Sequence, residues 1–419
     1  MFYRLLSSIF IYFTCLLAVE PQGERLRLAP LVEEALRRNP QIVAAQKRYE
    51  AAKQRPDIAG SLPDPMLSGG YTSSGSPRPV AGLGQEPIAN VGVMFSQQFP
   101  FPGKRKLRAD IAATEAAVEF EQYQLAQQDV LARLRRAFYQ LHYTYKVLEV
   151  LTRNRDLLDR FRETTEARYS VGKAAQQDVF RAQTQLSLIE TRVLRLVQER
   201  RSREAEINNL LNRPVRTVLP PPEDLSVAAL EVTLDRLYEF ARANAPAIQR
   251  DQKMVERRQL AVNLARKGYY PDYTLSGGYY NMGRMPDMYE FRVDVDLPLY
   301  FWRKQRKEVA EQSAMASEAR HTLQSTANDL EYRIRDDYQM AQTSRRLMDV
   351  YRKTVLPQAN LTLESSLPSY ETGAVDFLTL LMNLDSILET EMNYQEEFLN
   401  YHLALIRLQE MTGMKLLED

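Results

Sequence analysis

A stretch of about 65 residues, from Lys104 to Arg168, contains neither proline nor glycine. As an α-helix it would run about 95 Å at 1.5 Å per residue. A compact domain of this size has a much smaller diameter, so the chain must fold into something elongated. Apolar residues recur along the stretch at intervals of three and four, as at Leu131, Leu134 and Phe138. This spacing is typical of a coiled-coil seam.

The second half of the chain repeats the first half in the same order. The motif Pro-Asp-x-x-Leu-Ser-Gly-Gly-Tyr occurs at 63–71 and again at 271–279. The motif Tyr-x-x-Gly occurs at 169–172 and again at 370–373. The stretch 213–233 contains three consecutive prolines and separates the two halves as a connector.

These landmarks predict the domain organisation. We expect a leader at 1–19, a first repeat at 20–212, the connector at 213–233, a second repeat at 234–413 and a tail at 414–419. Within the repeats we expect strands at about 66–75, 90–99, 271–280 and 289–298. We expect long helices at about 104–168, 174–212, 303–366 and 376–412, the third of them interrupted at Pro357.

The chain starts with a short basic segment and an apolar run from Leu5 to Val19. As a helix this run covers about 22 Å of a hydrocarbon core about 30 Å thick, so it predicts a cleaved secretory signal peptide rather than an anchor. The one cysteine, Cys15, lies inside the run, and its lipidation is the alternative. No second apolar run of 18 residues follows.

Four shorter runs alternate between apolar and polar residues. In the clearest run, Phe291, Val293 and Val295 share one face, and the opposite face carries Arg292, Asp294 and Asp296. Each run has about 9 or 10 residues, the length of a tilted transmembrane β-strand. A soluble sheet packed on helices would alternate in the same way.

Aromatic and basic residues follow the second and fourth runs and favour a membrane location. They are Phe99, Phe101, Lys104 and Arg105 after one run, and Tyr300, Phe301, Trp302 and Arg303 after the other. Such flanks are typical of a membrane–water interface. Unpaired backbone groups in hydrocarbon cost several kcal/mol each, so a transmembrane sheet has to close. Closure takes about eight strands or more, so several copies of a four-stranded chain must share one barrel.

The composition argues against several other classes of protein. The chain has 55 Lys and Arg against 54 Asp and Glu, so no basic field draws it to nucleic acid. Its mean hydropathy of −0.42 excludes a polytopic helical membrane protein. One Cys, three His and 16 Gly leave little material for disulfides, metal sites or phosphate loops. We therefore expect neither an enzyme nor a cofactor.

The duplicated strands, long helices and Tyr-x-x-Gly turns resemble those of the TolC-like outer-membrane factors, the outer membrane efflux protein family. The resemblance extends from Asn39-Pro40 to Thr412-Gly413. It implies a mixed α/β membrane protein, internally duplicated, that forms a homotrimer in the outer membrane of a Gram-negative bacterium. Each protomer of such a trimer gives four strands to a 12-stranded transmembrane β-barrel. A long α-helical coiled-coil barrel continues it through the periplasm.

The resemblance also implies what the protein does and with what it assembles. The family provides a passive exit duct through outer-membrane lipid, linked by a periplasmic adaptor (membrane fusion protein) to an inner-membrane RND-type pump or an ABC transporter. Type I protein secretion and drug efflux are alternative tasks for such a duct. A periplasmic coiled-coil adaptor or scaffold is the alternative from another class, and it would be extracted without detergent.

The two turns would form the gate at the inner end of this tunnel. The matching residues are Tyr169, Gly172, Asp178 and Arg181 in the first repeat and Tyr370, Gly373 and Asp376 in the second. The second turn lacks the arginine that the family places shortly after the glycine, and Thr379 stands where a second aspartate is expected. Helix N-capping is the alternative role of Asp178 and Asp376.

One motif resembles the CzcC/CusC-like heavy-metal branch of the family. It is the segment Phe-Pro-Phe-Pro-Gly-Lys-Arg at 99–105. Met282, Met285 and Met288 lie between the third and fourth runs, and thioether sulfur suits soft metal ions. An adaptable apolar loop is the alternative that we favour for these methionines.

Overall fold

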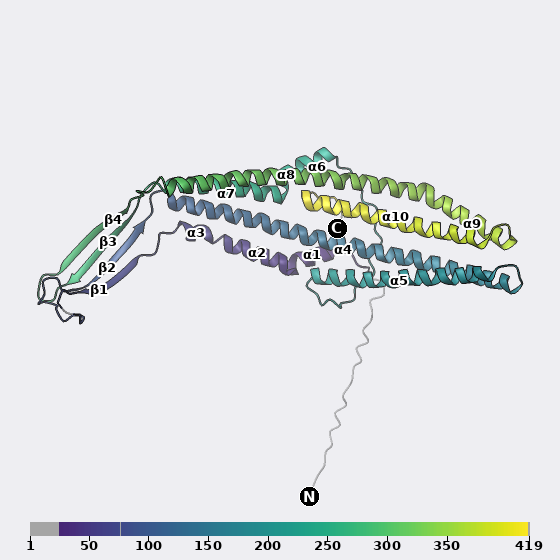
Figure 1. Cartoon of the computed structure of the whole chain (residues 1–419), viewed down its shortest axis with the longest axis horizontal. Coiled ribbons are helices and arrows are strands. Elements are labelled where there is room, and N and C mark those ends of the chain that lie inside the picture. Colours follow the sequence, from purple (N-terminus) through teal and green to yellow (C-terminus); the bar gives the residue numbers. More distant parts are fainter. Residues whose placement is uncertain (1–24, 76, 418–419) are drawn as a thin grey trace, which may run out of the picture.

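The chain folds into a long rod with its strands at one end and two helical turns at the other (Figure 1). The computed structural model describes residues 25–75 and 77–417. The predicted leader at 1–19, and Cys15 with it, lies outside the described residues. In the part of the chain that is described, no helix combines the length and the apolar character that a membrane crossing requires.

The two halves have the same order of elements. The first half contains α1 (Leu28–Arg38), α2 (Pro40–Ala52), α3 (Arg55–Gly60), β1 (Met66–Thr72), β2 (Asn90–Phe99), α4 (Lys104–Ser170) and α5 (Gln176–Leu210). The second half contains α6 (Leu234–Asn244), α7 (Pro246–Lys267), β3 (Asp272–Asn281), β4 (Met288–Asp296), α8 (Gln305–Val350), the π-helical turn η1 (Tyr351–Val355), α9 (Leu356–Thr372) and α10 (Phe377–Thr412). Each half thus supplies a pair of strands and a long helical hairpin.

The four strands form one antiparallel sheet in the order β1-β2-β3-β4. In this register Phe95 lies opposite Leu67 and Gly277, and Val293 lies opposite Leu275. Because side chains alternate between faces, one face of the sheet is apolar across all four strands. Its side chains are exposed, and Phe291 reaches an exposed fraction of 77%. Within the described chain β1 and β4 are the edges of the sheet.

The long helices begin and end at residues that break helical geometry. Helix α4 has 67 residues, about 100 Å at 1.5 Å per residue, between Gly103 and Gly172, which both have positive φ. Helix α8 runs 46 residues and passes through η1 into α9, which ends at Gly373 with φ +82°.

The interruption expected at Pro357 takes the form of a π-helical turn just before it. In η1 the amide of Leu356 bonds to the carbonyl of Tyr351, five residues back. Proline has no N–H to continue the ladder, and the widened turn absorbs the missing bond without ending the helix. Helix α9 then continues to Thr372, beyond the predicted end at 366, and contains Pro368.

Two helices in each half meet end to end. In the first half the Asn39 side chain donates to the carbonyl of Leu210 at 2.8 Å, and its Oδ1 accepts from the amides of Gln41 and Ile42. Asn39 therefore caps the start of α2 and joins it to the end of α5. In the second half, the end of α10 and the start of α7 line a cavity of about 450 Å³ together with α4 and α8.

Two apolar clusters hold the rod together. One lies at its middle and includes Leu31, Leu134 and Leu405. The other lies towards the turns and is formed by residues of α4, α5, α9 and α10. His142 and His402 are buried in the middle region, and their burial lowers the pKa of each to about 4. Both imidazoles are therefore neutral at ordinary pH.

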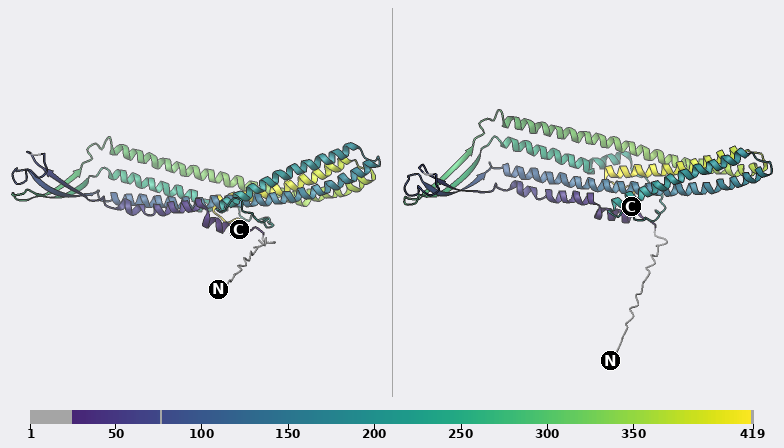
Figure 2. Two further views of the ribbon diagram at one scale, coloured as in Figure 1. Left: turned by 90° about the horizontal axis from the view of Figure 1, so that it is seen from below. Right: turned by 60° about the horizontal axis from the view of Figure 1, so that its bottom comes forward.

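The connector between the halves crosses the rod at its middle, from the end of α5 to the start of α6 (Figure 1 and Figure 2). The amide of Leu26 donates to the carbonyl of Pro221 at 2.9 Å, which ties the connector to the start of the described chain. Lys146 on α4 forms an ion pair with Asp224 at 2.6 Å. The Tyr401 hydroxyl on α10 donates to the carbonyl of Ala228 at 2.7 Å. These contacts fasten the connector to both hairpins.

Candidate functional site

Most charged residues on the polar face of the sheet lie on its edge strand β4, and Asp272 adds one at the start of β3. Arg292, Asp294 and Asp296 share this face of β4, opposite in orientation to the apolar residues between them. The guanidinium of Arg292 lies 3.0 Å from Asp294 and 3.9 Å from Glu290. By contrast, β1 and β2 place only small or uncharged residues on the polar face. Each chain therefore presents one charged stripe on β4.

Tyr280 lies across the same polar face, a position that the sequence analysis did not single out. A Cβ built on Gly92 would stand 2.1 Å from Cδ1 of Tyr280, so the ring lies directly over this glycine. The Tyr280 hydroxyl donates to Glu290 at 2.9 Å. Gly92 lies directly opposite Tyr280 in the register of β2 and β3. A glycine within a strand often marks a close approach of another group, but its partner can be identified only when the strand pairing is known.

The aromatic residues predicted at the membrane interface gather where the strands meet the helices. Phe101 stacks on Tyr270 with ring centroids 4.5 Å apart, and the Lys267 ammonium lies 5.3 Å from both centroids. In the segment between β4 and α8, the rings of Phe301 and Trp302 pack edge to face with centroids 5.1 Å apart. Phe99 ends β2, and the segment from Tyr300 to Arg303 is exposed.

Two of the predicted interface cations have a different role. Lys104 is 7% exposed, and its ammonium donates to Asp272 at 2.8 Å and to the carbonyl of Tyr270 at 2.9 Å. Arg105 donates to the carbonyl of Gly60 at 2.9 Å. Lys104 thus braces the junction between α4 and the sheet, and Arg105 ties the start of α4 to the end of α3. In the sequence, Asp272 belongs to the repeated Pro-Asp motif, and this repetition was the one feature that could have indicated a structural partner for Lys104.

The first turn of the helical end joins α4 to α5. Tyr169 is 45% exposed, and its carbonyl accepts the amide of Gly172, which has φ +72°. Ala175 precedes α5 at its N-cap position, so Asp178 lies inside the first turn of α5 and is not its N-cap. The Asp178 carboxylate lies 3.6 Å from the guanidinium of Arg181.

The second turn joins α9 to α10 and is more enclosed. Tyr370 is 4% exposed, and its hydroxyl lies 3.0 Å from that of Thr165 on α4. Asp376 is the N-cap of α10 and accepts the amide of Thr379 at 3.0 Å. Hydrogen bonding from the Thr379 side chain and amide lowers the pKa of Asp376. The two aspartates that the repeat aligns therefore occupy different positions in their helices.

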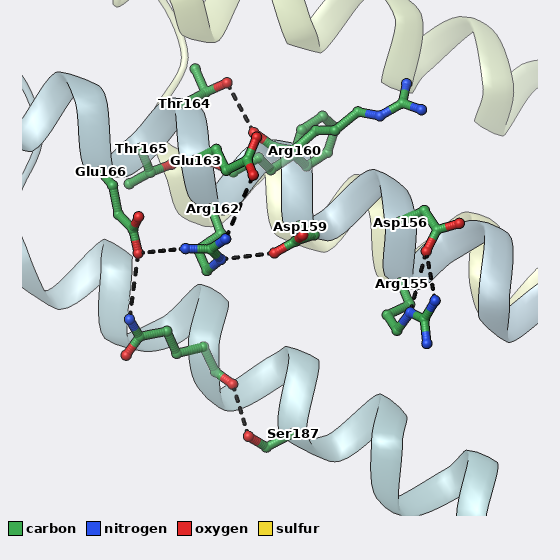
Figure 3. Close-up of polar contacts among 12 residues, drawn as sticks. Arg155, Asp156, Asp159, Arg160, Arg162, Glu163, Thr164, Thr165, Glu166 and Ser187 are labelled. Atoms are coloured by element: carbon green, nitrogen blue, oxygen red, sulfur yellow. Dashed lines mark hydrogen bonds and ion pairs between the residues drawn. The ribbon is translucent and has the colours of Figure 1, made fainter.

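Near the first turn, α4 carries a network of charged side chains (Figure 3). Arg162 forms ion pairs with Asp159 at 2.8 Å, Glu166 at 2.9 Å and Glu163 at 3.8 Å. The side-chain amide of Gln183 on α5 reaches Glu166 at 3.5 Å. The network lies along α4 and reaches α5 through Gln183, so it links the two helices of the first hairpin.

The methionines proposed for soft metals lie in the connection between β3 and β4. Met282 and Met285 belong to a turn in which the amide of Met285 donates to the carbonyl of Met282 at 3.4 Å, and Met288 begins β4. Among the residues that the structure describes, no group of three or more His, Cys, Asp or Glu could hold a metal ion.

The chain combines an amphipathic four-stranded sheet with two long helical hairpins. The model of the outer membrane efflux protein family matches residues 31–213 and 237–414, so the chain belongs to that family. It is an outer-membrane channel component of an efflux system, located in the outer membrane and extending into the periplasm. The family is one of transport proteins and not of enzymes.

Known proteins share this architecture at low sequence identity. The outer membrane protein TolC of Vibrio cholerae is 21% identical over 411 residues, covering 92% of this chain and 90% of TolC. The structure of VceC from Vibrio cholerae superimposes with a TM-score of 0.77 at 20% identity, covering 91% of this chain and 95% of VceC. CusC superimposes with a TM-score of 0.76 at 13% identity, covering 92% and 91%. The predicted TolC-like resemblance is confirmed.

Proposed function

We propose that three copies of this chain share one 12-stranded barrel, to which each copy contributes its four strands. The observation that carries this proposal is a sheet with one apolar face and two open edges. An open edge in hydrocarbon leaves N–H and C=O groups unpaired, at several kcal/mol each. Pairing β1 of one copy with β4 of the next removes every edge, which is the only way a sheet this small can span a bilayer.

The two faces of the sheet then have separate tasks. The apolar face, which includes Phe95, Phe291 and Val293, contacts lipid. The polar face surrounds the exit, where Arg292, Asp294 and Asp296 line the lumen. Burial of the apolar face in lipid contributes about 25 cal/mol per Å² of apolar surface removed from water. The same alternation that makes the sheet unsuitable for water makes it a wall between lipid and a water-filled pore.

The helical hairpins continue this pore through the periplasm. Substrate passes along it without chemistry, and an inner-membrane pump of the RND or ABC type supplies the energy through a periplasmic adaptor. The turns around Gly172 and Gly373 form the inner end of the duct. Asp178 and Asp376 place carboxylates next to these turns, where a ring of negative charge attracts cations.

Cross-linking between strand edges tests the barrel. We would place cysteines at Ser68 on β1 and Asp294 on β4, in a chain with Cys15 replaced by serine, and add a bis-maleimide reagent with a reach of about 10 Å, roughly two strand spacings. Covalent dimers and trimers are expected. The control pair, Ser68 with Met94, lies directly opposite within one chain and should give monomers. Monomers from both pairs would contradict the shared barrel.

Conductance in planar bilayers tests the inner constriction. Replacing Asp178 and Asp376 together by asparagine should lower the cation selectivity of the current, because a focused negative potential that attracts cations is removed. Asparagine caps a helix about as well as aspartate, so this substitution separates charge from capping at Asp376. Unchanged selectivity in the asparagine double variant would assign these residues to capping and pairing alone.

A further inference from the structure

Arg168 connects the two helical turns within one chain. It lies in the last turn of α4, just before the connecting turn at 171–175, and its Nη1 donates to the carbonyl of Tyr370 at 2.8 Å and to that of Glu371 at 2.5 Å. Both acceptors belong to the last turn of α9. An arginine from the first hairpin therefore holds the backbone of the second.

Two further contacts fix the geometry of this link. The guanidinium carbon of Arg168 lies 4.8 Å from the ring centroid of Tyr370. The hydroxyl of the same tyrosine lies 3.0 Å from that of Thr165, one turn earlier on α4. The Tyr370 ring is thus enclosed between α4 and the start of α10, where Phe377 packs at a centroid distance of 5.9 Å. Arg168 covers the exposed end of this enclosure.

The chemistry of the acceptors makes this a strong contact. The last carbonyls of a helix lack intrahelical partners and carry the negative end of its dipole. A guanidinium that donates to them forms charge-assisted hydrogen bonds, and its position over an aromatic face adds a cation–π attraction. Because the acceptors are main-chain atoms, the contact requires no carboxylate in the second turn.

The second repeat has no arginine at the position that corresponds to Arg168, so it cannot make the equivalent contact to the first turn. Ser369 occupies the position before Tyr370 that Arg168 occupies before Tyr169. No arginine follows Gly373, since Ala374, Val375 and Asp376 complete the second turn. The turn that lacks its own cation is therefore the one that receives a cation from the neighbouring hairpin.

We propose that Arg168 is a positioning residue that clasps the two turns of each chain together and thereby sets the width of the inner end of the duct. This inference rests on the proposed role of the turns as that inner end. When Arg168 releases the carbonyls of Tyr370 and Glu371, the second hairpin is free to move away from the first. Other polar links between the hairpins, such as Arg153 with Glu391 at 2.6 Å, lie farther from the turns and remain in place.

The distance between the turns tests the clasp directly. Spin labels at Lys173→Cys and Ala374→Cys, in the full chain with Cys15→Ser, report that distance by pulsed electron resonance on detergent-purified protein. Arg168→Gln should lengthen and broaden the distance distribution. Arg153→Gln is the matched control, because it removes the same charge from the same helix and breaks another link between the same hairpins. An Arg168→Gln distribution identical to that of the unsubstituted Arg168 protein would overturn the proposal.

Channel recordings separate this inference from the proposed function. In planar bilayers Arg168→Gln should raise the open fraction roughly tenfold, the effect of losing a charge-assisted hydrogen bond, and Arg153→Gln should leave it unchanged. If the wild-type protein forms no channel, the proposed function fails, while the spin-label distances still test the clasp. If the wild type conducts and Arg168→Gln conducts identically, the proposed role of Arg168 is contradicted, while the proposed function as a duct is not. Arg168→Lys keeps the charge and a donor, and we expect it to restore the wild-type behaviour in part.

Discussion

The two turns at the end of the helical hairpins share the Tyr-x-x-Gly motif but not its surroundings. Tyr169 in the first turn is 45% exposed, whereas Tyr370 in the second is 4% exposed and lies against Thr165 and Arg168. Duplication copied the local conformation, including a glycine with positive φ at each turn. The surroundings differ, because Thr165 and Arg168 of α4 contact Tyr370, whereas Tyr169 lies largely at the surface. The second turn depends on the first hairpin, and the first turn is self-contained.

The largest expected contrast comes from removing each tyrosine. Tyr370→Ala should lower the local stability of its turn by about 3 kcal/mol, the usual cost of deleting a buried aromatic ring. Tyr169→Ala should change stability by less than about 0.5 kcal/mol, as most exposed substitutions do. Native-state hydrogen exchange of the amides in α9 and α10 measures both effects. Equal effects would remove the contrast between the turns.

Alanine substitution should destabilise the protein equally at the two turn glycines, Gly172 and Gly373, although it should not at the two turn tyrosines. Alanine at Gly172 or at Gly373 has to adopt a left-handed backbone conformation, at a cost of about 1 kcal/mol each. A Cβ at Gly172 meets nothing within 4 Å, and one at Gly373 meets only Arg168 Nη2 at 3.7 Å, an ordinary contact. The thermal unfolding of the two variants should therefore shift by similar amounts. A much larger loss at Gly373 would mean that the asymmetry extends to the backbone.

The aligned aspartates should differ through their positions in the helix. Asp376→Ala removes the N-cap of α10 and should raise the exchange rate of the Thr379 amide by about fivefold. Asp178→Ala removes an exposed ion pair and should change exchange in α5 by less than about twofold. Asp376→Asn, which keeps the cap, is the control for the first variant. Faster exchange in Asp376→Asn would assign the effect to charge and not to capping.

Lowering the pH should destabilise the start of α10 through protonation of Asp376, and we expect this effect to be smaller than that of Asp376→Ala. The pKa of Asp376 is lower in the folded chain than in the unfolded chain, so the carboxylate stabilises the fold above its unfolded pKa. This contribution is lost as the pH falls through the folded value. Exchange of the Thr379 amide, corrected for the intrinsic rate, should accelerate below about pH 4. In Asp376→Asn the exchange of the Thr379 amide should not accelerate at low pH. If it does, a group other than Asp376 is responsible.

The features that local rules determine could be predicted from the sequence. Alternation along 290–297 assigned Phe291 and Arg292 to opposite faces because side-chain orientation has a period of two. The absence of proline and glycine predicted the length of α4 because these two residues disfavour a helix interior most. The family resemblance followed from such local patterns and is confirmed by the family match.

The features that depend on tertiary neighbours could not be predicted in this way. Lys104 follows an aromatic pair, as interfacial lysines do, yet it is buried against Asp272, about 170 residues away along the chain. Arg168 has no unusual neighbours in the sequence, and its role appears only when α4 lies beside α9. In both turns the N-cap lies three residues after the glycine, at Ala175 and at Asp376, so Asp178, which lies three residues beyond Ala175, falls inside its helix.

The end-to-end meeting of helices has a mechanical consequence. At the middle of the rod, α2 and α5 are separate pieces joined through Asn39, and α7 and α10 are separate pieces beside a cavity. Among the helices of residues 25–75 and 77–417, only α4 and α8 cross this level unbroken. Resistance to bending there therefore rests on two covalent helices, while the butted pairs can open slightly on the stretched side. The chain is a rod with built-in joints at one height, and we expect a sideways load on the hairpins to bend it there and to disturb the four-stranded sheet less.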